Sequence, residues 1–138
     1  MNRRFPKAEH LCSRRLIERL YTEGHRLRVF PYSVQWLEAP TLEVPCQVLI
    51  VAPKRRLHHA VDRNRIKRLT RECYRLRKEP LLQTLQEREM RIVLSLVYIH
   101  NELMTYEQLD RKFDKLMAAL QKELVHEETV QRAEVVVE

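Results

Sequence analysis

The sequence predicts an α+β fold in which a small mixed β-sheet and three main helices form a two-layer sandwich. Two observations lead to this class. Three segments place their apolar residues at helical spacing, and the segments between them alternate at period two or are continuously apolar, as strands are. The predicted order is helix, two or three strands, helix, strand, helix. With 138 residues the chain fits a single domain, which we place at residues 1–125.

The first predicted helix spans residues 13–23, and one of its faces is apolar, with Leu16, Ile17, Leu20 and Tyr21. Gly24, the only glycine in the chain, follows at the position where a left-handed C-terminal cap is favourable. The helix is therefore expected to end just before Gly24.

Residues 27–37 are expected to be extended because their side chains alternate, with Tyr32, Val34 and Trp36 on one face and Ser33, Gln35 and Leu37 on the other. Pro31 predicts an edge, a bulge or a break between two short strands. Residues 46–52 (CQVLIVA) indicate a buried strand that Pro53 ends. Residues 91–99 (RIVLSLVYI) are rich in β-branched side chains and indicate a central strand.

A second helix is predicted from about Asp62 to Lys78, where Pro80 interrupts it before a further turn or two. The last helix starts at a capping box formed by Thr105 and Gln108. It runs to about Leu124 and turns four side chains toward the core: Leu109, Phe113, Leu116 and Leu120. Residues 126–138 are acidic and lack a partner pattern, so we expect this tail to be disordered.

Composition excludes several classes of protein. The longest nearly pure apolar run, residues 92–99, is far shorter than the roughly 20 residues of a membrane span, so no membrane partner is expected. The N-terminus has no apolar segment typical of a signal peptide. The three cysteines, at positions 12, 46 and 73, are odd in number and widely spaced, which favours a reducing cytoplasm.

Positive charge is concentrated in one segment. Residues 54–78 contain eleven Lys and Arg residues and two acids, so this segment has a net charge of +9. The whole chain has a net charge of +7, and the other residues therefore sum to −2. A charge run usually marks a solvated helix face. Here the rest of the chain is slightly acidic, which favours a dedicated site for a polyanion.

A helical wheel over residues 62–78 separates an apolar stripe, formed by Ile66, Leu69, Cys73 and Leu76, from a basic far face. The far face is expected to carry Arg63, Asn64, Lys67, Arg68, Arg71, Tyr74, Arg75 and Lys78, with Arg65 at its border. Like charges four residues apart destabilise a helix by a few tenths of a kcal/mol per pair. A bound phosphate backbone would offset this cost by releasing counterions.

Other interpretations of the basic helix fit less well. A helix lying on a membrane would use Trp or Phe in its apolar stripe, and this stripe has cysteine and aliphatic residues. DNA-recognition helices mostly belong to all-helical domains, whereas predicted strands flank this helix. Cys46 and Cys73 are expected to be core thiols. The histidines lack the spacing of a zinc site, and no catalytic motif stands out, so we predict neither a catalytic nor a metal-ligating residue.

Residues 60–75 (AVDRNRIKRLTRECYR) resemble the signature of the bacterial ribonuclease P protein component. That pattern is Ala-Val, a spacer, Arg-Asn-Arg, a spacer, Lys-Arg, two spacers, Arg-Glu, a spacer, an aromatic residue and Arg. Every element is present, and the likeness extends over about residues 5–121. The resemblance implies an α/β sandwich with a left-handed βαβ crossover, similar to a domain of small-subunit ribosomal proteins.

The resemblance implies an accessory subunit of an RNA-based endoribonuclease that removes the 5′ leader of precursor tRNA. The catalytic RNA and its Mg²⁺ ions perform the hydrolysis, while the protein aids RNA folding, lowers the metal requirement and holds the leader. The signature helix and the loop before it would contact the catalytic RNA, which corresponds here to Lys54, Arg55, Arg56, Arg63, Asn64, Arg65, Lys67, Arg68, Arg71 and Arg75.

The resemblance also implies that the leader lies in a cleft between the first helix and a face of the sheet. Ile17 and Tyr21 match helix positions where the family commonly has aromatic residues, and Tyr32 or Trp36 would supply a sheet aromatic. These two residues are explained equally well as ordinary sheet residues. Two other functions stay open at this point: a structural RNA binder that uses the same helix, and a protein-only nuclease with clustered carboxylates or histidines.

Overall fold

The computed structural model describes the backbone of residues 4–137 and the side chains of residues 4–125. Its elements are the short 3₁₀ helix η1 (Lys7–Glu9), α1 (Arg14–Glu23), β1 (His25–Val29), β2 (Tyr32–Glu38), β3 (Cys46–Val51), α2 (Ala60–Glu87), β4 (Ile92–Tyr98) and α3 (Tyr106–Val137). The predicted class and element order are confirmed. The extended segment around Pro31 is a hairpin of two short strands.

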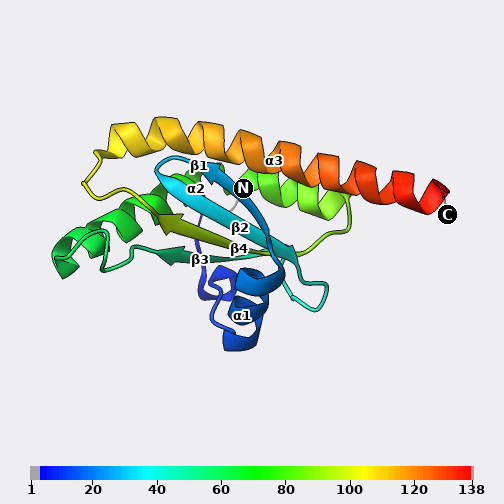
Figure 1. The fold of residues 1–138 in the computed structure, drawn as a ribbon, viewed down its shortest axis with the longest axis horizontal. Helices are drawn as coiled ribbons and strands as arrows, with labels where there is room; N and C mark the ends of the chain where they lie inside the picture. Colours follow the sequence, from blue (N-terminus) through cyan, green and yellow to red (C-terminus); the bar gives the residue numbers. More distant parts are fainter. Residues whose placement is uncertain (1–3, 138) are drawn as a thin grey trace.

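The four strands form a mixed sheet in the order β1-β2-β4-β3 (Figure 1). β2 pairs antiparallel with both β1 and β4, whereas β3 and β4 are parallel and are joined by the crossover helix α2. Tyr32 pairs with Tyr98, and Val51 pairs with Val97. The β1–β2 turn and the C-terminal ends of β3 and β4 therefore share one end of the sheet.

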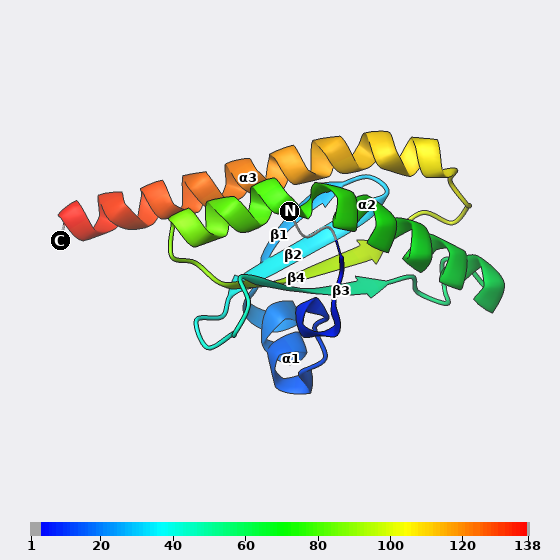
Figure 2. The same cartoon turned by 180° about the vertical axis from the view of Figure 1, so that it is seen from behind.

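Helices cover both faces of the sheet. α2 and α3 lie side by side over one face, and α1 lies against the other (Figures 1 and 2). The main core is formed between the sheet and the α2–α3 pair, and a smaller cluster around Leu20 and Val93 fixes α1. The predicted two-layer sandwich thus corresponds to the sheet with α2 and α3, and α1 adds a partial layer behind it.

α1 begins and ends where the sequence predicts, but Gly24 acts for a different reason. The Ser13 side chain caps the helix by accepting a hydrogen bond from the Leu16 backbone N–H at 3.3 Å. Gly24 has φ −69° and is extended rather than left-handed. A Cβ at this position would lie 2.3 Å from the Leu20 carbonyl oxygen and 3.2 Å from that of Trp36. Glycine is therefore required mainly because the chain turns back close to the last turn of α1, and it also permits a tight contact with β2.

The structure of α2 differs from the sequence prediction in three details. The helix continues through Pro80 to Glu87, because Pro80 is exposed and Leu81 and Leu85 anchor the second half in the core. Tyr74 and Lys78, expected on the basic far face, are buried. The N-terminal segment covers this flank of the helix and places Phe5 against the Tyr74 ring at 5.3 Å. Leu76, expected in the apolar stripe, is exposed.

α3 begins with the predicted capping box. The Thr105 backbone N–H donates to Gln108 Oε1 at 2.9 Å, and the Gln108 N–H donates to Thr105 Oγ1 at 3.2 Å. The four predicted core side chains of this helix are fully buried. The helix reaches Val137 rather than ending near Leu124. The prediction of a disordered tail over residues 126–138 falls on residues whose side chains lie outside the described part of the chain, and it stays a prediction.

Candidate nucleic-acid interface

The first three turns of α2 and the loop before them carry a dense group of exposed cations. Six predicted contact residues are exposed there: Lys54, Arg55, Asn64, Arg65, Arg68 and Arg71. Among the described residues, none is an ion-pair partner of Arg65, Arg68 or Arg71. Their guanidinium groups therefore keep their full charge and their donors for a ligand. We call this set, together with the half-buried Lys67, the α2 basic face.

Two of the predicted contact residues also shape the loop. Arg63 Nη1 donates to the carbonyl oxygens of Leu57 and His58, both at 2.9 Å, and so ties the loop to the first turn of α2. Arg56 Nη1 donates to Asn101 Oδ1 at 3.3 Å, which links the same loop to the segment after β4. These arginines hold the loop in place beside the exposed cations.

Arg75 differs from the other cations because an acid neutralises it. Its guanidinium donates to both carboxylate oxygens of Glu72, at 2.5 and 3.1 Å. Hydrogen bonding to Arg75 holds the pKa of the Glu72 carboxyl below its ordinary value. Arg75 thus adds less to the positive potential of α2 than Arg68 or Arg71.

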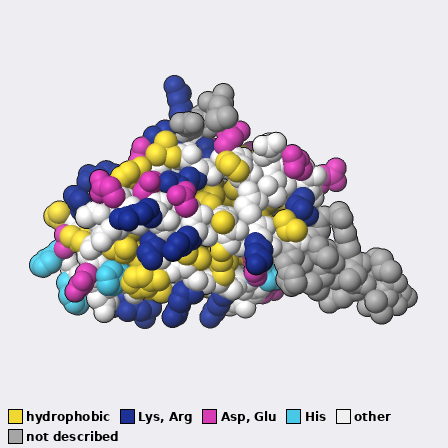
Figure 3. Space-filling view, turned by 90° about the horizontal axis from the view of Figure 1, so that it is seen from above, with side chains coloured by type: hydrophobic (Ala, Val, Ile, Leu, Met, Phe, Trp, Pro, Cys, Tyr) yellow, Lys and Arg dark blue, Asp and Glu magenta, His cyan; other side chains and the backbone are white. Residues whose placement is uncertain are grey.

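Seen from above, the face formed by α2 and α3 carries Lys and Arg side chains together with Asp and Glu (Figure 3). Part of this mixture is structural. Arg77 on α2 contacts Asp110 at 2.5 Å and Asp114 at 2.7 Å on α3, and only 19% of its side chain is exposed. Arg77 therefore joins the two helices and is distinct from the α2 basic face.

Two of the four residues predicted for the leader cleft, Ile17 and Tyr21, lie between α1 and the sheet. The Tyr21 hydroxyl is hydrogen-bonded to the Ser95 hydroxyl of β4 at 2.8 Å. Ile17 packs against the smaller apolar cluster. Gln35 pairs with Ser95 in the sheet, and its Nε2 is buried with no hydrogen-bond partner in the described structure.

Sequence reasoning did not select Gln35 or Ser95. The available signal was the alternation along β2, which places Gln35 opposite to its neighbours Val34 and Trp36. We call Tyr21, Ser95 and Gln35 the α1-side polar cluster.

The other two predicted cleft residues, Tyr32 and Trp36, lie on the wrong face of the sheet for that role. Each is 1% exposed and packs in the core beneath α2 and α3. The Tyr32 hydroxyl is hydrogen-bonded to Thr70 Oγ1 at 2.6 Å, and the Trp36 ring stacks on His25 at 4.3 Å. The large apolar set of β2 faces the two amphipathic helices because this burial removes more apolar surface from water.

The buried cysteines behave as core thiols, as predicted. Burial raises the pKa of Cys46 to about 12 and that of Cys73 to about 11, so both thiols stay protonated at neutral pH. Cys12 is exposed. In the described part of the chain, no three His, Cys, Asp or Glu side chains gather as metal ligands would. The described helices include none long and apolar enough to cross a membrane.

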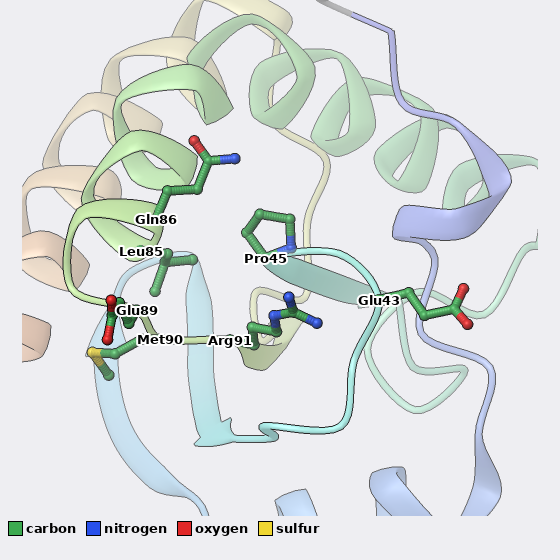
Figure 4. A pocket seen from close by; sticks show the side chains of 7 residues that line it. All are labelled: Glu43, Pro45, Leu85, Gln86, Glu89, Met90 and Arg91. Carbon is green, nitrogen blue, oxygen red and sulfur yellow. The ribbon is translucent and has the colours of Figure 1, made fainter.

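A pocket of about 380 Å³ lies at the opposite end of α2 from the signature residues (Figure 4). Leu85 and Gln86 from α2 meet Pro45 before β3 and the segment Glu89–Arg91 before β4. None of the residues predicted from the sequence to bind RNA lines this pocket. The α2 basic face and the α1-side polar cluster therefore remain the candidate surfaces.

Comparisons with known proteins agree with the fold and the signature. The family model for ribonuclease P matches residues 5–121. The ribonuclease P protein component of Porphyromonas gingivalis is 34% identical over 110 residues, covering 79% of this chain and 80% of that protein. That of Chlorobaculum tepidum is 37% identical over 84 residues, covering 58% and 54%.

The structure of the Staphylococcus aureus RNase P protein has the same fold, with a TM-score of 0.68 and 20% identity over 83% of this chain and 96% of that chain. The family match covers nearly all of the described core, including the signature residues of α2. The chain therefore belongs to the bacterial ribonuclease P protein component family.

Proposed function

We propose that this chain binds the catalytic RNA of ribonuclease P through the α2 basic face and holds the 5′ leader of precursor tRNA at the α1-side polar cluster. The observation that carries the proposal is the group of exposed arginines without ion-pair partners in the described structure, Arg65, Arg68 and Arg71. Their mutual repulsion lowers helix stability, and a phosphate backbone removes that repulsion on binding.

The α1-side polar cluster supports the leader-binding part of the proposal. Tyr21 is half-buried and its hydroxyl is fixed by Ser95, so its ring has a defined orientation for stacking on a base. The buried Gln35 amide has an unused donor, and an unpaired donor in a buried position costs about 1–3 kcal/mol. This donor lies beneath the surface, so the half-buried Tyr21 ring is the member of the cluster that we propose meets the leader directly.

The side chains of the α2 basic face support a division of roles in which the protein binds RNA and the RNA subunit performs the hydrolysis. The α2 basic face offers cations and hydrogen-bond donors, which suit phosphate binding, and supplies no nucleophile or general base. We therefore assign the hydrolysis and its Mg²⁺ ions to the RNA subunit, in the cytoplasm. The protein cations lower the repulsion between RNA segments, so less Mg²⁺ is needed to fold the complex and to hold its substrate.

Reconstitution tests the proposal. The purified chain is mixed with the ribonuclease P RNA of its own source at low Mg²⁺, and cleavage of a precursor tRNA is followed. We expect cleavage when both components are present and none with the protein alone. Cleavage by the protein alone would indicate a protein-only nuclease. No effect of the protein on cleavage, together with tight binding to ribosomal RNA, would indicate a structural RNA binder.

The α2 basic face makes a prediction about salt. Arg68→Ala and Arg71→Ala should each weaken binding to the catalytic RNA and lower the slope of log K against log salt by about one unit, because each loses one phosphate contact. Titrations at several salt concentrations measure both quantities. Lys115→Ala on α3 removes another exposed cation, away from α2, and should leave the slope unchanged. A slope that stays at the wild-type value in the R68A/R71A double variant would contradict the assignment.

A further inference from the structure

The β1–β2 turn presents an aromatic ring to solvent. Phe30 is 47% exposed, and in the described part of the chain every other Phe, Tyr and Trp is buried or half-buried. Turns are normally formed by polar residues, glycine or proline, so a solvent-exposed phenylalanine in this turn is unusual. A single exposed apolar side chain is common on protein surfaces, but this one is an aromatic ring close to exposed cations, a combination that suits a nucleic-acid base.

The ring is held in a fixed setting. The edge of Phe30 meets the His100 ring with 5.0 Å between ring centroids, and His100 in turn lies 6.3 Å from the buried Tyr98 ring. The Ile99 backbone N–H donates to the Pro31 carbonyl oxygen at 2.8 Å, which fixes the turn to the segment after β4. The Tyr98 hydroxyl donates to the Glu102 carbonyl oxygen at 2.6 Å and fixes that segment. Phe30 is thus an exposed platform on a turn that is tied to the segment after β4.

This platform lies at the end of the sheet from which the basic loop departs. The strand pairs Tyr32–Tyr98 and Val51–Val97 bring the β1–β2 turn, the segment after β4 and the loop after β3 to one end. The hydrogen bond from Arg56 to Asn101 joins the basic loop to the segment that carries His100. Lys54 and Arg55 in that loop are exposed, and so is Arg28 just before the turn.

We propose that Phe30 stacks on an unpaired base of the catalytic RNA, next to backbone phosphates held by Lys54 and Arg55. An exposed ring among cations is the combination that single-stranded RNA segments use, since the base covers the ring and the phosphates meet the cations. The inference rests on the proposed function. We assign the base to the catalytic RNA because Phe30 is linked to the loop of the α2 basic face, whereas Tyr21 lies over the strand face covered by α1.

Four variants test this stacking contact in titrations with the catalytic RNA. Phe30→Ala should weaken binding about tenfold, whereas Phe30→Tyr should bind as the wild type does. The salt slope of Phe30→Ala should stay unchanged, because stacking releases no counterions, whereas that of Arg55→Ala should fall by about one unit. Leu76→Ala is the control: it removes an exposed apolar side chain from α2, away from the β1–β2 turn, and the variant should bind the catalytic RNA normally. Unfolding curves confirm that each variant is folded.

Phe30→Trp gives a direct signal, because the one native tryptophan, Trp36, is buried and contributes a constant background. Quenching of the new tryptophan by the catalytic RNA alone is the expected result. Quenching only after precursor tRNA is added, or no quenching while binding is intact, would overturn the inference. If the wild-type chain fails to bind the catalytic RNA at all, the proposed function itself is wrong, so the two failures are distinguishable.

Discussion

Lys78→Met is expected to lower the free energy of unfolding by about 3–5 kcal/mol, a large share of the roughly 5–15 kcal/mol of a domain this size. The Lys78 ammonium group is almost fully buried and donates to both Glu9 carboxylate oxygens, at 2.8 and 3.2 Å, and to the Arg4 carbonyl oxygen. Removing it leaves the Glu9 carboxylate without its cation in a site where its side chain is 12% exposed.

The loss should be carried by the N-terminal segment. Glu9 belongs to η1, and the chain continues from there to His10, which bridges to Val48, and to Leu11, whose N–H donates to the Val48 carbonyl oxygen at 2.9 Å. Lys78 therefore ties the segment before α1 to α2 on the other side of the β3 edge. Hydrogen exchange should show earlier opening of residues 5–11 in the variant than in the wild type.

Urea unfolding of a small set of variants tests this expectation. Arg19→Ala breaks an ion pair with Glu23 whose side chains are 49% and 57% exposed, and should cost less than about 1 kcal/mol. The double variant Lys78→Met, Glu9→Leu should recover much of the lost stability, because it removes both buried charges. A Lys78→Met variant that is no less stable than Arg19→Ala would show that the buried pair contributes little.

The Lys78–Glu9 pair also explains why the sequence prediction for α2 was incomplete. Helical periodicity located the apolar stripe through Ile66 and Cys73, because those residues face the sheet. Periodicity treats a helix as having one buried face, and here the N-terminal segment covers a second one. Tyr74 and Lys78 lie beneath that segment, which has no apolar pattern long enough to predict its position.

Local patterns predicted the element ends well where a local interaction sets them. The Thr105 capping box is a contact within four residues and occurs as predicted, and the Ser13 cap at the start of α1 is equally local. Gly24 is favoured mainly by the close approach of its backbone to the Leu20 carbonyl oxygen in the last turn of α1, and in addition by a tight contact with the Trp36 carbonyl oxygen, which no local pattern reveals. The signature residues of α2 could be identified from the sequence because their motif has fixed spacing within one short segment.

The leader-binding surface was harder to predict because it depends on which face of the sheet α1 covers. Alternation along β2 separates Tyr32 and Trp36 from Ser33 and Gln35, but it does not say which set meets which helix. In the structure the larger apolar set meets the two long helices, and α1 receives the more polar set. The aromatic residues that looked suited to base stacking are thus core residues, and the buried polar side chains of Gln35 and Ser95 lie beneath Tyr21 on the α1 side.

Trp36→Ala and Tyr21→Ala are therefore expected to have opposite consequences. Trp36→Ala should lower the free energy of unfolding by about 3–5 kcal/mol, because a fully buried indole is lost and a cavity remains. Tyr21→Ala removes a half-buried ring and should leave the chain folded. It should weaken the binding of precursor tRNA to the reconstituted enzyme about tenfold, while mature tRNA, which lacks the leader, binds as before.

The ratio of precursor to mature tRNA affinity separates the two roles without relying on a badly destabilised protein. Trp36→Phe keeps an aromatic ring in the core and should fold, so it serves as the matched variant for Trp36. We expect this ratio to equal the wild-type value in Trp36→Phe and to fall in Tyr21→Ala. Tyr21→Phe should keep most of the ratio, because the ring remains and only the hydroxyl contact to Ser95 is lost. A ratio that falls in Trp36→Phe and stays intact in Tyr21→Ala would place the leader on the other face of the sheet.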